Sequence, residues 1–401
     1  MTSGEESERG LLRSAESTQR ATFLELFFDL VFVFALTRIS QRLINDFSSD
    51  RRILFSEAGQ TLLLFLALWL VWTLTALTTS RLDPDQPAIQ LVVVGTMFGA
   101  MVMAVAVPKG FGERAIVFAG AYVALQFGRT LLLLVAHNRD RDVPVRLIIW
   151  LGLSAVPWLF GATSDDARLR GVLWTIAILL DYGGAIAGWP VPGLGRGPAA
   201  NVPIAGEHLA ERYQQFLLIT LGESILVIGL TFSGADFAVD RAAAFLVSFL
   251  TTVLLWRIYF HQAGHLLPLA ITSARHQGRF GRSMSFSHLL MIAGIVLTAV
   301  GYELAIAHPL GHITPVWLYT MLGGPALFLT GRALFEYQVY ARVSRSRTGG
   351  LILLGLLVPA MLHVPPLVVS VSAAVVLAGV ALADAFRSRG RTTPEQPTPS
   401  L

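Results

Sequence analysis

The sequence has no cysteine, only one lysine and few charged residues of either sign. With no Cys among its 401 residues, the chain cannot form disulfides, Cys-ligated zinc sites, iron–sulfur clusters or thiol nucleophiles. Lys109 is the only lysine, so Schiff-base chemistry is restricted to that residue. Asp, Glu, Lys and Arg make up 14% of the chain, against about 25% in an ordinary soluble domain. This composition argues against a nucleic-acid-binding module and against a disordered chain.

The chain is instead strongly apolar. Apolar residues make up 54% of it, which would leave a soluble protein too little polar surface to cover itself, so we expect a polytopic membrane protein. The net charge of +4 is expected to reflect basic loops that set membrane orientation. The first twenty residues are polar and lack the apolar region of a cleavable signal peptide, so we expect the first apolar run to remain as a membrane helix.

Apolar runs of the length needed to cross a bilayer, roughly 20 residues, recur along the chain. They predict an all-α transmembrane helical bundle of about twelve spans, with ten or eleven also compatible. The predicted spans are residues 22–44, 58–80, 88–108, 114–136, 145–161, 169–189, 210–233, 241–260, 285–307, 313–338, 349–365 and 367–386. The last two are separated only by Pro365 and Pro366, so they are one kinked helix or a re-entrant pair.

The placement of arginine in the connecting segments predicts the orientation. Arginines concentrate in the segments that share a side with the N-terminus, which puts both termini in the cytoplasm. The arginines between Arg38 and Arg52 are the exception, because they fall on the other side.

Two stretches of the chain resemble each other. Residues 121–134 resemble residues 323–337, and Gly128-Arg129 then aligns with Gly331-Arg332. The similarity predicts two parallel six-span pseudo-repeats related by an axis along the membrane normal. Chance similarity between apolar helices is the alternative. The predicted parts are a cytoplasmic segment 1–20, a first repeat 21–189, a Pro/Gly-rich linker 190–206, a second repeat 207–387 and a disordered cytoplasmic tail 388–401.

The first predicted span contains two carboxylates. Glu25 and Asp29 are spaced i,i+4, which puts both on one helix face. An ionisable group in a span costs about 2.5–3.5 kcal/mol on insertion scales, so it persists where it pairs or lines a polar path. Two close, buried carboxylates could hold a proton near neutral pH. The alternative is that Glu25 lies at the headgroup level and pairs with an arginine.

The seventh predicted span contains a third carboxylate. Glu223 lies about half-way along it, beside Gly222 and Ser224, which could allow close helix approach and donate a hydrogen bond. The start of this span also holds four charged or titratable residues, for which salt bridges within the helix start are the simplest explanation. They are Glu207, His208, Glu211 and Arg212.

Arg129 and Arg332 are the predicted counter-ions for the buried carboxylates. Arg129 would pair with Asp29 and Arg332 with Glu223, or the pairs would cross. Glu336, one turn beyond Arg332, could instead satisfy it locally.

Histidines give a weaker pattern. His261 and His265 are spaced i,i+4, which could hold a metal, although histidines at a membrane interface are commoner. The sequence has no Walker A, Rossmann or zincin motif. We therefore predict no metal, no cofactor and no catalytic residue.

Two segments carry a family resemblance. TFLELFFDLVFVFALTRIS (22–40) resembles the first signature of the bacterial low-temperature-requirement A (LtrA) family, and HLAERYQQFLLITLGESILVIG (208–229) is similar to the second. The resemblance extends over residues 20–387 and implies a multi-pass bacterial inner-membrane protein, from a family named for growth in the cold whose biochemical activity is not established. Tyr213-Gln214-Gln215 is bulkier than the family pattern. The matching positions are Glu25, Leu26, Phe27, Phe28, Asp29, His208, Glu211, Arg212, Leu221, Gly222, Glu223 and Ser224.

The residues and the resemblance together favour transport of an unidentified small molecule or ion, with or without coupling to protons. Asp29 and Glu223 would cycle protons, while Arg129 and Arg332 would tune them or bind an anionic substrate. The alternatives are a non-catalytic scaffold or sensor linked to cold growth, and an intramembrane enzyme acting on a lipid-like substrate. The lipid bilayer is the expected partner, and nucleic acid is not.

Overall fold

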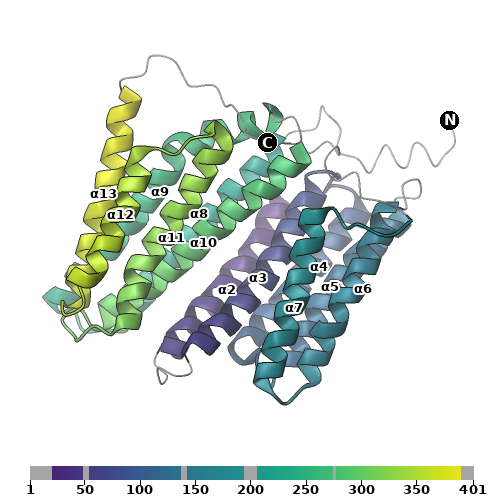
Figure 1. Ribbon diagram of the computed structural model, residues 1–401, viewed down its shortest axis with the longest axis horizontal. Helices are drawn as coiled ribbons and strands as arrows, with labels where there is room; N and C mark the ends of the chain where they lie inside the picture. Colours follow the sequence, from purple (N-terminus) through teal and green to yellow (C-terminus); the bar gives the residue numbers. More distant parts are fainter. Residues whose placement is uncertain (1–19, 48–53, 137–141, 194–205, 274–276, 390–401) are drawn as a thin grey trace. The chain divides into compact units, whose positions relative to one another are not determined.

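The protein is helical throughout the part that the structure, a computed structural model, describes (Figure 1). That part comprises residues 20–47, 54–136, 142–193, 206–273 and 277–389. It contains helices and their connections and no β-strand. The predicted segment 1–20, linker 190–206 and tail 388–401 lie almost entirely outside the described residues.

The described residues form twelve α-helices and one short 3-10 helix, and each predicted span overlaps one of the α-helices. The α-helices are α2 (Phe23–Phe47), α3 (Leu54–Thr79), α4 (Pro87–Ala106), α5 (Ala115–Ala136), α6 (Asp142–Thr163), α7 (Ala167–Ala187), α8 (Gly206–Ser233), α9 (Val239–Ser273), α10 (Gln277–Ala307), α11 (Pro315–Tyr340), α12 (Arg345–Ala360) and α13 (Pro366–Arg389). The 3-10 helix η1 (Val107–Lys109) follows α4.

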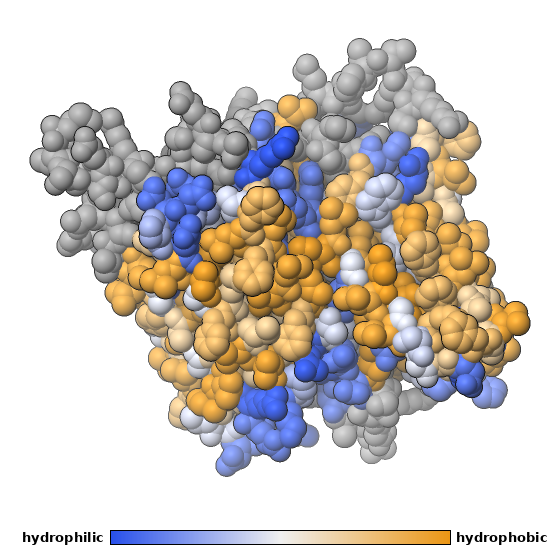
Figure 2. Space-filling model, turned by 180° about the vertical axis from the view of Figure 1, so that it is seen from behind, coloured by the Kyte–Doolittle hydropathy of each residue, from blue (hydrophilic) through white to orange (hydrophobic). Residues whose placement is uncertain are grey.

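Nine of the helices in the described part are long and apolar enough to cross a membrane. The helices α2, α11 and α12 are not among the nine. Large apolar side chains point outward on many helices: Phe98, Val156 and Leu230 are 73%, 68% and 68% exposed. In Figure 2, apolar side chains cover large areas of the face shown, and polar side chains gather mainly toward its upper and lower edges. Such a surface is suited to lipid and confirms the membrane character predicted from composition.

The last two predicted spans are separate helices that pack against each other, not one kinked helix. The helix α12 ends at Ala360, and α13 begins at Pro366. Proline is tolerated at the first position of a helix because the N–H it lacks would have no partner within the helix. Pro366 therefore begins α13, whereas α12 ends at Ala360, before either proline.

Contacts divide the chain into two units, which are described separately. Unit 1 is Met1–Arg212 with His276–Arg282, and unit 2 is Tyr213–Arg275 with Ser283–Leu401. In unit 1, α2 packs on α3 and α4, and the helices α4 to α7 pack on one another in chain order. In unit 2, α13 packs on α9, α11 and α12.

Glycines bring α10 and α11 of unit 2 into close contact. A Cβ atom added to Gly294 would lie 2.4 Å from the backbone nitrogen of Phe328, and one added to Gly331 would lie 2.7 Å from the carbonyl oxygen of Ser287. Small residues at such crossings are typical of membrane helix pairs, because they let the backbones meet. Gly128, which the repeat aligns with Gly331, faces open space instead. The two glycines therefore differ in their packing.

Candidate functional site

Four ionisable side chains from the two signature segments meet in unit 1. Glu25 and Asp29 come from the first two turns of α2, and His208 and Arg212 come from the first two turns of α8. Their side chains are at most 1% exposed. The i,i+4 spacing within each segment puts each pair on one helix face, so two acids oppose two bases. We refer to these four residues as the α2–α8 cluster.

A capping box fixes the acidic end of the cluster. Thr22 precedes α2, and its Oγ1 accepts a hydrogen bond from the backbone N–H of Glu25 at 3.3 Å. In return, Glu25 Oε2 accepts from the backbone N–H of Thr22 at 2.9 Å and from its hydroxyl at 3.1 Å. This is the reciprocal Thr-x-x-Glu arrangement of a helix N-terminus. It begins α2 at Phe23 and orients the Glu25 carboxylate.

Asp29 is held by one cationic and one aromatic side chain, Arg212 and Trp72. Arg212 donates from Nη2 to Asp29 Oδ1 at 2.8 Å, and Trp72 of α3 donates from Nε1 to the same oxygen at 2.8 Å. The Arg212 guanidinium carbon lies 5.7 Å from the ring centre of Phe28 and 6.0 Å from that of Trp72. The charge of Arg212 is therefore stabilised by a carboxylate and by aromatic faces in a site that water does not reach.

His208 links Glu25 to the end of α3. Its Nε2 lies 2.9 Å from Glu25 Oε2, and its Nδ1 lies 3.1 Å from Ser80 Oγ. Ser80 donates its one hydroxyl proton to the carbonyl of Ala76 at 2.7 Å, so its Oγ is left to accept from Nδ1. Glu25 Oε2 already accepts from Thr22, which favours Nε2 as a donor as well. The hydrogen-bond pattern therefore assigns both ring protons to His208, as an imidazolium.

With His208 as an imidazolium, the charges of the α2–α8 cluster cancel. Not every polar atom in it is satisfied, however. Glu25 Oε1, Asp29 Oδ2 and two nitrogens of Arg212, Nε and Nη1, are buried and make no hydrogen bond. Glu25 Oε1 lies 3.9 Å from Arg212 Nε, too far for a hydrogen bond. The cluster thus has buried donors and acceptors available for a further proton or a small polar ligand.

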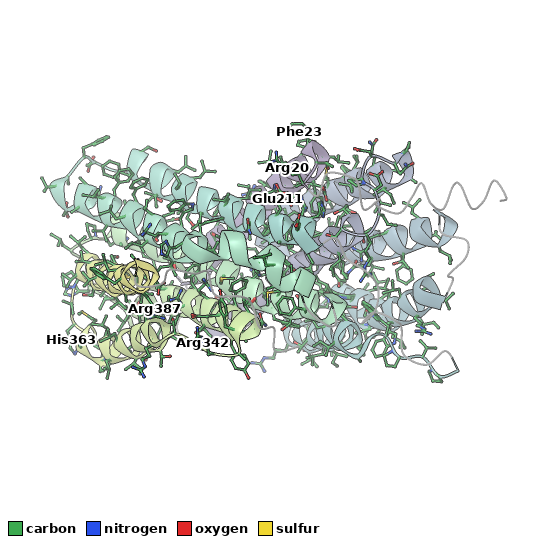
Figure 3. The ribbon with its side chains drawn as sticks, turned by 90° about the horizontal axis from the view of Figure 1, so that it is seen from above. Arg20, Phe23, Glu211, Arg342, His363 and Arg387 are labelled. Atoms are coloured by element: carbon green, nitrogen blue, oxygen red, sulfur yellow. The ribbon has the colours of Figure 1, made fainter. Side chains whose placement is uncertain are left out.

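Glu211 extends the cluster toward the helix ends. Its Oε2 accepts from the backbone N–H of Ala21 at 2.9 Å, which ties the start of α8 to the residues before α2. Figure 3 shows Glu211 beside Arg20 and Phe23. Glu207 is exposed. Salt bridges within the start of α8 were the simplest expectation for this segment, but His208 and Arg212 reach across to α2 instead.

The predicted pairing of Arg129 with Asp29 is not present. Arg129 on α5 donates to Gln126 Oε1, Gln126 donates to Tyr122 Oη at 3.2 Å, and Tyr122 donates to Asp181 Oδ2 of α7 at 2.7 Å. A relay of neutral groups therefore connects Arg129 to a carboxylate that the prediction did not pair with it. Asp29 instead forms its ion pair with Arg212. Arg212 lies at the start of a helix, where the sequence predicted a surface residue.

Most predicted residues of unit 2 are buried, Glu336 being half-buried, but their contacts differ from expectation. Glu223 and Ser224 of α8 are 0% and 1% exposed. Ser224 Oγ donates to the carbonyl of Thr220 at 3.3 Å and not to the neighbouring carboxylate. Glu336 does not satisfy Arg332, because it lies 3.5 Å from the guanidinium of Arg347, the third residue of α12.

No group of three or more possible metal ligands occurs among the described residues. The side chain of His265 is outside the described residues. His288, in unit 2, is bonded to protein groups on both sides: Nδ1 lies 2.8 Å from the carbonyl oxygen of Met284, and Nε2 lies 2.9 Å from Tyr259 Oη.

Sequence reasoning missed Trp72, Ser80 and Thr22. The Thr-x-x-Glu spacing at residues 22–25 was a readable signal for the cap. No local pattern identifies Trp72 or Ser80, because each acts through a partner far away in the sequence.

Comparisons with known proteins agree with the two signatures. The model of the family described as bacterial low temperature requirement A protein (LtrA) matches residues 20–382. The chain is also 38% identical over 339 residues to the uncharacterized protein RA0937 of Rhizobium meliloti (strain 1021), which covers 83% of this chain and 81% of that one. No solved structure matches the chain.

Proposed function

The chain belongs to the bacterial low temperature requirement A family, and from this premise we propose that it is a proton-coupled membrane transporter whose proton site is the α2–α8 cluster. The observation that carries the proposal is the buried contact of Glu25 with His208 at 2.9 Å, beside the ion pair of Asp29 and Arg212. Titratable groups inside membrane helices are costly and are commonly kept for proton relays.

The cluster would exchange its proton between His208 and Glu25. Removal of that proton leaves two carboxylates facing one guanidinium, a net charge of −1 in a site that excludes water. Such a charge is costly while the site stays buried. Proton release would therefore favour a movement of the start of α8 away from α2 that opens the cluster to water, which is how protonation could drive a transport cycle.

The proposal includes the other charged residues predicted for a proton or substrate path. Glu223 and Ser224 would form a second carboxylate site, supported by their burial in α8. Arg129 would act through the relay that leads to Asp181. Arg332 and Glu336 would act separately, since they do not pair.

We also propose twelve spans in two parallel six-span repeats. The helices α2 to α7 would make the first repeat and α8 to α13 the second, and each set has six members. The sixth helix of each set carries a buried aspartate, Asp181 and Asp384, that accepts side-chain hydrogen bonds. The location proposed is the bacterial inner membrane, with both termini cytoplasmic.

One arginine that opposes this orientation has a structural reason to be where it is. Arg42 is 8% exposed and donates from Nη1 to the carbonyl oxygens of Val107 and Pro108 at 3.1 and 3.0 Å. Its Nε donates to Thr61 Oγ1 at 2.9 Å. A free arginine in a loop indicates that the loop is cytoplasmic. Arg42 does not carry this indication, because its guanidinium is bound to protein groups.

A second candidate function is a non-catalytic scaffold or sensor. The observation that favours it is the cancellation of charge within the cluster, since balanced ion pairs can serve only to hold α2 and α8 together. The two functions differ in whether the cluster's proton moves during turnover.

Proton flux in liposomes separates them. Purified protein would be reconstituted with an internal pH dye, and a pH gradient would be imposed across the membrane. Transport predicts flux in the wild type that Glu25→Gln and His208→Gln each abolish. Glu113→Gln is the matched control, because Glu113 is exposed in a connection and forms a surface ion pair with Lys109. Equal flux in wild type and Glu25→Gln, or no flux in any variant with and without added solutes, would favour the scaffold.

A further inference from the structure

Arg332 of unit 2 is a buried cation with no carboxylate partner among the described residues. It lies in α11 and is 2% exposed. Its contacts are one hydrogen bond from Nε to the carbonyl of Ile258, 3.4 Å long, and the ring of Phe335, whose centre lies 4.9 Å from the guanidinium carbon. Its Nη1 is buried and makes no hydrogen bond. A charged group in this state is costly unless something compensates it.

The nearest acids of the unit are engaged with other cations. Arg347 forms ion pairs with Asp384 and with Glu336. Arg387 joins the same group through Ser346, whose hydroxyl donates to Asp384 at 3.0 Å. Together with Arg332, the group holds three guanidinium groups and two carboxylates. One positive charge is therefore left over, and Arg332 is the member without an ion pair.

The side chains around Arg332 do not supply the missing negative charge. His288 Nδ1 faces the carbonyl oxygen of Met284, so it carries a proton, and Nε2 is left to accept from the Tyr259 hydroxyl. That assigns a neutral imidazole and a neutral phenol. The Phe335 ring packs edge-on against His288, with centroids 5.8 Å apart. On the side of Phe335 the guanidinium thus faces aromatic, uncharged side chains, while Glu336 and Asp384 nearby are paired with Arg347.

We infer that Arg332 binds a small monovalent carboxylate. With Nε engaged by Ile258, the two Nη atoms form the end-on fork of a guanidinium, and two parallel hydrogen bonds from such a fork match a carboxylate. The flanking rings would contact a short apolar part of the ligand. The claim that such a carboxylate is the substrate of the transporter rests on the proposed function. Binding of the carboxylate to Arg332 is independent of proton movement.

Equilibrium binding of acetate tests the inference. The full-length protein in nanodiscs of neutral lipid would be titrated with sodium acetate at constant ionic strength, in a buffer whose only other anion is a bulky sulfonate, and thermal unfolding would be followed. We expect a saturable rise of the unfolding temperature in the wild type and in Arg345→Gln, which removes an exposed arginine of the same unit. Binding in Arg332→Gln should be weaker by at least about tenfold, the loss of one charged hydrogen bond. Arg332→Lys should fall between them.

A second readout separates a ligand site from a structural arginine. In acetate-free buffer, Arg332→Gln should unfold at or above the wild-type temperature, because the substitution removes an uncompensated buried charge. A lower unfolding temperature there, no saturable effect in the wild type, or an unchanged effect in Arg332→Gln would each overturn the inference. Chloride binding as tight as acetate would overturn the choice of a carboxylate. Lost acetate binding with intact proton flux would remove the anion site and leave the proposed function standing.

Discussion

Arg212 on α8 and Asp29 on α2 form a buried ion pair, with Nη2 2.8 Å from Oδ1, between residues 183 positions apart in the chain. The pair joins the two signature segments of the family within unit 1. Beside it, His208 and Glu25 form a second acid–base contact, so the four charges balance. The account of function depends on whether this arrangement only holds two helices together or also exchanges a proton.

The energetic coupling of Asp29 and Arg212 can be measured with a double-mutant cycle. Breaking a buried pair typically costs about 3–5 kcal/mol. Because Glu25 still faces Arg212, we expect Asp29→Asn to lower the free energy of unfolding by less, about 2–3 kcal/mol. Arg212→Gln should cost the full amount, since it leaves two carboxylates with His208 alone. The double variant should be at least about 1 kcal/mol more stable than the sum of the two predicts.

Denaturant unfolding of the protein in mild detergent would give these values. Glu207→Gln is the control, because Glu207 is exposed on the same helix, and it should change the stability by less than about 0.5 kcal/mol. Additive effects of Asp29→Asn and Arg212→Gln would contradict the contact.

Trp72 should stabilise the charge of Asp29 through its indole N–H. Trp72→Phe keeps most of the aromatic volume but removes the donor, so we expect a loss of about 1.5–3 kcal/mol, the value of a hydrogen bond to a charged group. Trp256→Phe is the comparison, because Trp256 is 45% exposed. A loss of the same size in both variants would assign the effect to packing alone.

Ser80 should keep His208 in its doubly protonated form. Ser80→Ala removes the acceptor of the Nδ1 proton, so we expect a folded protein with a clearly slower proton flux in liposomes. Thr78→Ala is the matched control, because its hydroxyl makes the same type of bond, to the carbonyl four residues earlier. If the two variants conduct protons at the same rate, Ser80 has no part in proton exchange.

The close crossing of α10 and α11 should not tolerate a methyl group. Gly294→Ala would place Cβ against the α11 backbone, which cannot give way as a flexible side chain can, so we expect a loss of about 1–3 kcal/mol. Gly229→Ala, at an exposed helix position with open space around it, should be neutral or stabilise by up to about 1 kcal/mol. Thermal unfolding gives the stability of both variants. Equal stability would show that α10 and α11 can move apart without lowering the free energy of unfolding.

The helices could be predicted from the sequence because each contains an apolar run, and in nine of the described helices that run is long enough to cross a membrane. The buried carboxylates Glu25 and Asp29 were also recognisable, since charges inside such runs stand out. Their partners were not. Arg129 was expected to pair with Asp29 because it lies mid-span, yet the partner is Arg212, near a helix start. A pairing over 183 positions depends on how helices pack, and one sequence holds no local trace of it.

Unit 2 shows the same limit at helix ends. Arg347 was assigned to a connection because the apolar run begins two residues later, at residue 349. The helix α12 starts at Arg345, and Arg347 is 2% exposed and paired with Asp384. Hydropathy marks where apolar residues begin, whereas polar residues that pair with a neighbouring helix extend the buried segment beyond that point.

The most direct measurement of the central claim is infrared difference spectroscopy of the reconstituted protein between alkaline and acidic buffer. Because the cluster's proton resides on His208 while both carboxylates are ionised, its release should give an imidazolium-to-imidazole band in the wild type that His208→Gln removes and Glu25→Gln shifts, while Glu113→Gln leaves it unchanged. An imidazole band that is identical in the wild type, His208→Gln and Glu25→Gln would contradict the claim that the α2–α8 cluster exchanges a proton.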